Sequence, residues 1–283
     1  HEASNRACIM MAEQGQKDIS WKQTLAGPKR EAAIEALDKE LTQLENTILK
    51  QVLPGTNEFE KAKTKAVPGR ILLDVKRGTG KLKARAVKQG FKENKHAADG
   101  PDFSYYSSVA KLVAVRCALF RPQRGNRRIA TKDIRGAFNQ SDAFPDGKYK
   151  YVCFRNPVKN EWQYYRQYGP LYGENSAPRR WENTLSDWFE SVGFRRGENE
   201  KSTFYHETRD LLVLTYVDDL FMDGDEDDVR WISDIISKRF DCKHTEWLTK
   251  ETPIDFLGMM ISINSEGISL SMENYVEQML TGQ

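Results

Sequence analysis

The chain has 283 residues, of which 39% are hydrophobic and 30% are charged. This length suffices for one large domain or two small ones with a buried core. All apolar runs are shorter than the roughly 18 residues that span a bilayer, and no hydrophobic signal segment opens the chain, so we expect no membrane partner. Four widely spaced cysteines indicate reduced thiols in an intracellular protein, and the first residue, His1, indicates a fragment of a longer chain.

Charge is distributed unevenly along the chain, although the net charge is only +2. Residues 61–95 contain twelve Lys and Arg and two acids, whereas residues 218–228 contain seven acids and no base. This pattern predicts a basic surface for a polyanion and an acidic site for metal ions. The alternative is a solvated surface whose charge has no binding role.

The N-terminal third of the sequence predicts one helix and one hairpin. Residues 1–28 show no clear periodicity and are expected to be loosely ordered. Apolar residues at steps of three and four predict one amphipathic helix over 29–52, which Pro54 and Gly55 end. Residues 69–76 and 81–88 predict a hairpin rich in Lys and Arg, suited to a phosphate backbone or a triphosphate.

The remaining elements alternate between helices and strands. Helices are predicted over 104–120, 177–192 (with Ser176 as the N-cap) and 225–240, and strands over 128–134, 149–154, 161–168, 254–263 and 267–270. The strand over 128–134 ends near Asp133. A lone Asp in this place is compatible with a helix cap or a turn as well as with a catalytic site.

Asp218 and Asp219 lie in the middle of the apolar stretch 211–222. The stretch predicts two buried strands with the aspartates at the tip of a tight hairpin. Two carboxylates this close raise each other's pKa unless a cation lies between them, and a divalent cation with oxygen ligands meets that need. The alternative is that the aspartates only form the turn.

Six segments, in order, resemble the reverse transcriptase domain of copia-type LTR retrotransposons. Lys-Ala-Arg-Ala-Val-Lys-Gln-Gly-Phe at residues 83–91 resembles the family's Lys-Ala-Arg-Leu-Val-x-Lys-Gly-Phe. The others are Val-Ala-Lys at 109–111, Asp-Ile-Arg-Gly-Ala-Phe at 133–138, Leu-Tyr-Gly at 171–173 followed by Ala-Pro-Arg at 177–179, Tyr-Val-Asp-Asp at 216–219 and Phe-Leu-Gly at 256–258.

The resemblance implies an α+β right-hand polymerase with palm, fingers and a partial thumb, whose antiparallel palm sheet carries the catalytic aspartates. The reverse transcriptase domain would span 29–283. Fingers and palm would interleave over about 29–240, and the primer grip and start of the thumb would occupy about 250–283.

The resemblance also implies an RNA-directed DNA polymerase, in which a primer 3′-hydroxyl attacks the α-phosphate of a dNTP. Asp133, Asp218 and Asp219 would be catalytic. With the Ile134 carbonyl they would hold two Mg²⁺ ions, for which Mn²⁺ could substitute.

Further roles follow from the same resemblance. The residues implied to contact the nucleotide are Lys83, Arg85, Phe138, Tyr172 and Gly173. Those implied to contact template and primer are Pro178, Tyr216, Val217, Phe256, Leu257 and Gly258. Phe138 would exclude a ribose 2′-hydroxyl, although a core Phe is the alternative, and Arg85 could instead belong to a solvated basic strand.

The implied partners are an RNA or DNA template with its primer, dNTPs, and protease, integrase and RNase H segments of a Pol polyprotein. The compartment would be a cytoplasmic particle or the nucleus. Three departures from the family pattern are Glu174-Asn175-Ser176 in place of Leu-Lys-Gln, serine for proline at 107–108, and the basic stretch 121–128. These departures leave open the alternative that the chain is a catalytically decayed relic of a retroelement that only binds nucleic acid. A palm-type enzyme such as a nucleotide cyclase is a third alternative.

Overall fold

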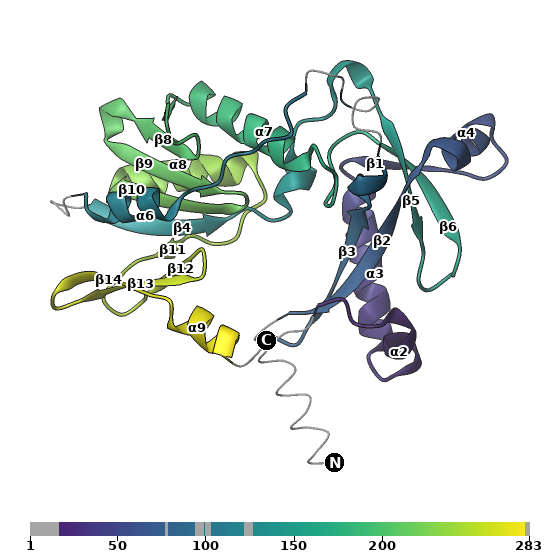
Figure 1. Cartoon of the computed structure of the whole chain (residues 1–283), viewed down its shortest axis with the longest axis horizontal. Coiled ribbons are helices and arrows are strands. Elements are labelled where there is room, and N and C mark those ends of the chain that lie inside the picture. Colours follow the sequence, from purple (N-terminus) through teal and green to yellow (C-terminus); the bar gives the residue numbers. More distant parts are fainter. Residues whose placement is uncertain (1–16, 77–78, 94–98, 100–102, 122–126, 281–283) are drawn as a thin grey trace, which may run out of the picture. The chain divides into compact units, whose positions relative to one another are not determined.

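The computed structural model describes residues 17–76, 79–93, 99, 103–121 and 127–280. The chain divides into two compact units, which we describe separately (Figure 1). Unit 1 comprises His1–Tyr105 and Ser141–Arg180, and unit 2 comprises Tyr106–Gln140 and Trp181–Gln283. Within the described residues, no helix combines the length and apolarity needed to cross a membrane.

Unit 1 is built on a five-stranded sheet with the order β1-β6-β5-β2-β3. The strands are β1 (Leu49–Val52), β2 (Val67–Val75), β3 (Leu82–Lys88), β5 (Lys150–Arg155) and β6 (Trp162–Gln167). The predicted basic hairpin is confirmed as β2 and β3, which pair antiparallel from Gly69–Lys88 to Val75–Leu82. Helix α3 (Arg30–Glu45) packs its buried leucines on this sheet, and α4 (Asn57–Lys65) follows β1.

The single helix predicted over 29–52 is correct as far as Glu45 and wrong beyond it. Helix α3 ends at Glu45, and Leu49–Val52 form strand β1, which pairs with β6. The apolar spacing that continues to Ile48 arises because Ile48 and Leu49 enter the same core as α3, now from a turn and a strand. Spacing alone does not distinguish these two ways of entering one core.

The segment 17–28, expected to be loosely ordered, contains helix α2 (Trp21–Ala26), and residues 1–16 lie outside the described residues. Ser20 caps α2 by accepting a hydrogen bond from the Gln23 amide. The Trp21 indole donates to the Ile71 carbonyl at 2.7 Å, which ties α2 to β2. Long-range contacts with β2, among them the bond from the Ile19 amide to the Leu73 carbonyl at 2.8 Å, therefore order a segment without hydrophobic periodicity.

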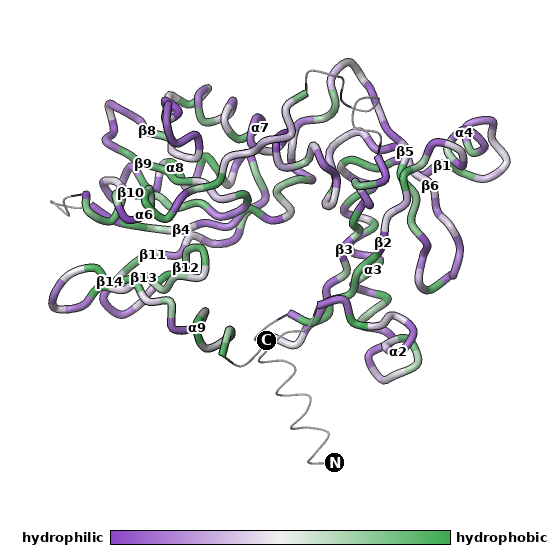
Figure 2. The backbone as a smooth tube through the Cα atoms, viewed as in Figure 1, coloured by the Kyte–Doolittle hydropathy of each residue, from purple (hydrophilic) through white to green (hydrophobic). Residues whose placement is uncertain are grey.

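Unit 2 is built on a six-stranded antiparallel sheet with the order β11-β4-β10-β9-β8-β7. The strands are β4 (Arg127–Asp133), β7 (Arg195–Arg196), β8 (Thr203–His206), β9 (Leu211–Tyr216), β10 (Asp219–Asp225) and β11 (Glu246–Trp247). Figure 2 shows hydrophobic stretches on β9 and β10. The buried strand-turn-strand predicted from 211–222 is thereby confirmed.

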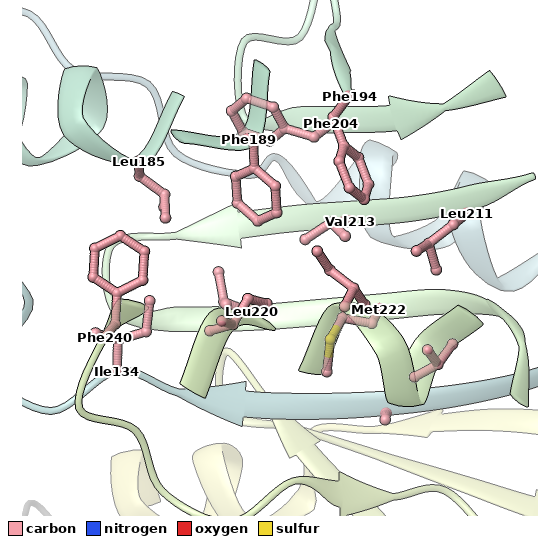
Figure 3. Close-up of a cluster of buried hydrophobic side chains, with 14 of the residues drawn as sticks. Ile134, Leu185, Phe189, Phe194, Phe204, Leu211, Val213, Leu220, Met222 and Phe240 are labelled. Carbon is pink, nitrogen blue, oxygen red and sulfur yellow. The ribbon is translucent and has the colours of Figure 1, made fainter. Parts of the chain in front are cut away.

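Both faces of the unit 2 sheet are covered. Helices α7 (Ala177–Ser191) and α8 (Glu226–Arg239) pack on the face that carries Leu220 and Met222 (Figure 3). Phe221 points to the opposite face, into a core shared with α6 (Leu112–Leu119) and the small sheet β12-β13-β14. Because successive strand residues alternate in direction, a sheet covered on both faces needs an uninterrupted apolar run.

Two predicted elements of unit 2 need correction. The helix predicted over 104–120 is confined to α6, because residues before it run extended, with the Ala110 amide donating to the Thr215 carbonyl at 3.2 Å. The strand predicted over 254–263 is interrupted. It forms β12 (Ile254–Phe256) and β13 (Met259–Asn264), joined by a turn in which Leu257 and Gly258 have φ of 59° and 72°. Strand β14 (Gly267–Ser271) and helix α9 (Glu273–Leu280) are the last elements within the described residues.

Candidate active site

The β9–β10 hairpin places Asp218 in a two-residue turn and Asp219 at the start of β10, paired with Tyr216. Val217, the first turn residue, has φ of 54°, a left-handed conformation that is strained for a β-branched side chain. Two hydrogen bonds hold the turn. The Trp181 indole donates to the Val217 carbonyl at 2.6 Å, and the Ile134 amide donates to the Asp218 carbonyl at 2.8 Å. Strain retained in this way is typical of functional sites.

Asp133 joins this tip from the neighbouring strand. It is the register partner of Asp219 across the β4–β10 pair. Burial, together with the charges of Asp218 and Asp133, raises the pKa of Asp219 from 3.8 to about 6. Three carboxylates, from β4, β10 and the turn between β9 and β10, therefore create a local excess of negative charge at this end of the sheet.

Lys243 is a residue of this site that sequence reasoning missed. Its ammonium lies 2.8 Å from Asp133 Oδ2, and its backbone amide donates to the Asp133 carbonyl at 2.8 Å. An ion pair between Arg135 and Asp241 fixes the segment before Lys243, since Arg135 Nη1 lies 2.6 Å from Asp241 Oδ1. Nothing in the spacing of this exposed lysine distinguishes it from the many others in the chain.

Asp255, on β12, is a second residue that the sequence did not indicate. Its charge raises the pKa of Asp219, whereas the charge of Lys243 lowers it. Asp255 Oδ1 also accepts a hydrogen bond from the Gly258 amide at 3.1 Å, which stabilises the turn between β12 and β13. The electrostatics of the site thus extend to the small sheet.

The donor set fits divalent cations. Carboxylate oxygens are the ligands that Mg²⁺ prefers, and a bound cation would relieve the repulsion that raises the pKa of Asp219. As the described side chains stand, no three His, Cys, Asp or Glu form a group ready to hold an ion. The Lys243 ammonium supplies part of the neutralisation at Asp133.

Residues that follow Asp133 line the same region. Ile134 and Cys242 pair in an isolated antiparallel β-bridge. Its two hydrogen bonds run from the Arg135 amide to the Asp241 carbonyl and from the Lys243 amide to the Asp133 carbonyl, so the bridge does not use the Ile134 carbonyl. Phe138 lies in a short 3₁₀ turn (Ala137–Gln140) and packs partly buried against the α7–α8 core.

The implied template-primer residues of unit 2 differ in exposure. Tyr216 is 37% exposed at the end of β9, and Gly258 is exposed in the β12–β13 turn. Phe256 is only 1% exposed, and its ring lies 5.5 Å from that of Phe221. Phe256 is therefore a core residue that supports the turn, whereas Leu257 and Gly258 form the turn.

The remaining implied residues belong to unit 1. Lys83 is exposed on β3, and Arg85 forms an ion pair with Asp74 on β2. The Tyr172 and Gly173 carbonyls accept hydrogen bonds from the Lys88 and Gly90 amides at 2.7 and 3.0 Å. The Tyr172–Gly173 turn therefore lies along the end of the strand that carries Lys83 and Arg85. Pro178 occupies the first turn of α7.

The antiparallel sheet of unit 2 has the right-hand polymerase fold. The family profile of reverse transcriptase (RNA-dependent DNA polymerase) matches residues 60–282. The chain belongs to this family. Two curated relatives are transposon proteins, which confirms the resemblance to retrotransposons. A Ty5-1 transposon protein of Saccharomyces cerevisiae is 28% identical over 130 residues, 44% of this chain and 39% of that protein. The retrovirus-related Pol polyprotein of transposon RE1 from Arabidopsis thaliana is 26% identical over 216 residues, 71% of this chain and 13% of that polyprotein.

A solved structure supports the fold. Telomerase of Candida albicans, in complex with a fragment of telomeric RNA, has a TM-score of 0.50 to this chain at 10% identity, covering 84% of this chain and 51% of the telomerase. At this identity the likeness shows the fold alone. The chain spans less than half the length of the curated relatives named above.

Proposed function

We propose that the chain is an RNA-directed DNA polymerase that adds dNTPs to a primer 3′-hydroxyl by two-metal nucleotidyl transfer. The observation that carries the proposal is the convergence of Asp133, Asp218 and Asp219 from two paired strands. Unit 2 would supply the palm, unit 1 the fingers, and residues 250–283 the primer grip and start of the thumb.

Each residue has a defined task in this proposal. The carboxylates, with the Ile134 carbonyl, would hold two Mg²⁺ ions or Mn²⁺, which when bound stabilise charge on the attacking and leaving oxygens. Tyr216 and Val217 would support the primer end, with Leu257 and Gly258 beside it and Pro178 toward the template. Lys83, Arg85, Tyr172 and Gly173 would contact the incoming nucleotide, with Phe138 against its sugar.

The relatives' names place their polymerases in transposon Pol polyproteins. We propose the same context here, with protease, integrase and RNase H on other segments, in a cytoplasmic particle or the nucleus. The position of the Glu174 side chain weakens one argument for the alternative of a decayed relic. Its side chain is fully buried in ion pairs with Lys88 and Lys150, so it is not an acid placed against nucleic acid.

The test is Mg²⁺-dependent incorporation of dTTP on a poly(rA)/oligo(dT) template-primer. Asp218→Asn should lower the rate at least about 100-fold, because it removes a metal ligand. Asp234→Asn, an exposed carboxylate on α8, is the matched control and should leave the rate unchanged. A folded wild type that binds the template-primer but incorporates no more than Asp218→Asn would establish the relic instead.

A further inference from the structure

Unit 1 contains a buried ionic cluster that the proposed reaction does not use directly. The Lys88 ammonium, with a fully buried side chain, lies 2.8 Å from Glu93 Oε1, 3.1 Å from Gln167 Oε1 and 3.7 Å from Glu174 Oε2. We call this group the Glu174 cluster. It balances three cations against three anions around one amide, and its members are Lys88, Glu93, Asp99, Lys150, Gln167, Glu174 and Arg180.

Glu174 is the centre of this cluster. Its carboxylate accepts hydrogen bonds from the Lys150 ammonium, the Gln167 amide and the Ser176 hydroxyl, and from the Leu171 backbone amide at 3.3 Å. Burial alone would raise the pKa of Glu174, but the charges of Lys88 and Lys150 lower it. The buried carboxylate is therefore ionised, and removing its charge would leave the fully buried Lys88 with Glu93 as its remaining carboxylate partner.

The cluster lies directly beneath the Tyr172–Gly173 turn, because Glu174 is the next residue. The turn rests on the end of β3 through the backbone hydrogen bonds of Lys88 and Gly90. The contact is close, since a Cβ on Gly173 would lie 2.2 Å from the Lys88 carbonyl oxygen. Gly173 also has φ of 80°, so this position of the turn needs a glycine.

The position of Lys88 explains how the cluster arises. The family pattern has Lys at the place of Gln89 and Leu at that of Glu174. In this chain the lysine stands at position 88, the last residue of β3, and alternate side chains of β3 are buried. Lys88 therefore points to the buried face of β3, where Glu174 lies.

We propose that Glu174 is a positioning residue that, through Lys88 and Lys150, holds the Tyr172–Gly173 turn against β3 in the arrangement that receives the incoming nucleotide. The proposal rests on the proposed polymerase function. A merely structural ion pair would contribute to stability without affecting this turn or the nucleotide.

The first experiment needs no activity. Hydrogen exchange is measured on the peptide covering residues 86–92, whose Lys88 and Gly90 amides bond the turn. Glu174→Gln should accelerate exchange of these amides about 10-fold or more relative to wild type. Glu58→Gln, which breaks the ion pair of α4 with Arg166, is the matched control and should leave them unchanged. Unchanged protection in Glu174→Gln overturns the proposal.

The second experiment separates KM from kcat for dTTP, at a temperature well below the Tm of each variant. Glu174→Gln should raise KM about 5-fold or more with kcat within about 2-fold, and Glu58→Gln should change neither. A lower Tm with unchanged KM shows a structural role only and overturns the proposal. An inactive wild type refutes the proposed function, and the exchange experiment still decides whether Glu174 holds the turn.

A double variant covers the case in which Glu174→Gln does not fold. Lys88→Met/Glu174→Leu replaces the buried pair by apolar side chains, which commonly preserves stability. Because the apolar pair would pack under the turn, we expect wild-type protection of residues 86–92 and a wild-type KM. A double variant that folds and protects residues 86–92 as wild type does, but still has a raised KM, would overturn the proposal, because holding the turn would then not restore nucleotide binding.

Discussion

Asp133 and Asp219 are register partners across β4 and β10, although 85 residues separate them in the chain. The pairing brings Asp133 to the tip that Asp218 and Asp219 form. It also explains why the pKa of Asp219 is raised to about 6, since burial and both neighbouring carboxylates disfavour its charged form.

Stability should depend on pH through Asp219. Because the folded-state pKa is raised from 3.8 to about 6, the folded chain binds more protons between about pH 4 and pH 6, and the free energy of unfolding falls as pH rises through this window. Asp219→Asn removes this loss. In EDTA, we expect the variant to exceed wild type by about 1–2 kcal/mol at pH 7, a value reduced for solvent screening, and by almost nothing at pH 4. Urea unfolding at both pH values measures this; a constant difference would contradict it.

Removal of the Lys243 ammonium should strengthen cation binding. Lys243→Met eliminates the positive charge beside Asp133, so we expect Mn²⁺ to bind the variant more tightly than wild type when no nucleic acid is present. The gain in affinity should be at most about 5-fold, because the ion pair is exposed and screened by solvent. Isothermal titration calorimetry measures the affinity, and Lys238→Met on α8 is the control. Weaker binding in Lys243→Met would mean that the lysine orients Asp133 for the cation.

Val217 should tolerate glycine better than its neighbours in β9 do. The left-handed conformation costs Val about 1–2 kcal/mol, and Val217→Gly removes this cost. The glycine in turn raises the backbone entropy of the unfolded chain and loses the partial packing of the Val side chain, so the two effects oppose each other. We expect the free energy of unfolding to change by less than about 1 kcal/mol. Val213→Gly, at a fully buried strand position, should cost at least about 2 kcal/mol more. Equal losses in chemical denaturation would show that the turn is unstrained.

Phe138 should decide between deoxy- and ribonucleotides. Phe138→Ala should lower the ratio of kcat/KM for dTTP over UTP at least about 10-fold, because the side chain no longer excludes the 2′-hydroxyl. Phe138→Tyr keeps the ring and should keep the ratio. If Phe138→Ala lowers Tm but leaves the ratio unchanged, Phe138 is only a core residue.

The sequence by itself determined the local parts of the site. The apolar run on both sides of Asp218 and Asp219 identified a buried hairpin, because a strand covered on both faces needs continuous apolar residues. The basic hairpin of β2 and β3 was predicted from two neighbouring strand segments, 69–76 and 81–88, that are rich in Lys and Arg. The order of six motifs, from 83–91 to 256–258, identified the family.

Tertiary structure alone decided the long-range pairings. The register of Asp133 with Asp219, the Lys243 ammonium on Asp133 and the burial of Phe256 all depend on which strands become neighbours, and no local spacing encodes that. The same holds for Glu174, which looked like a misplaced acid until the fold placed Lys88 and Lys150 beside it. A buried charge is stable only with its partners, and its partners here come from distant strands.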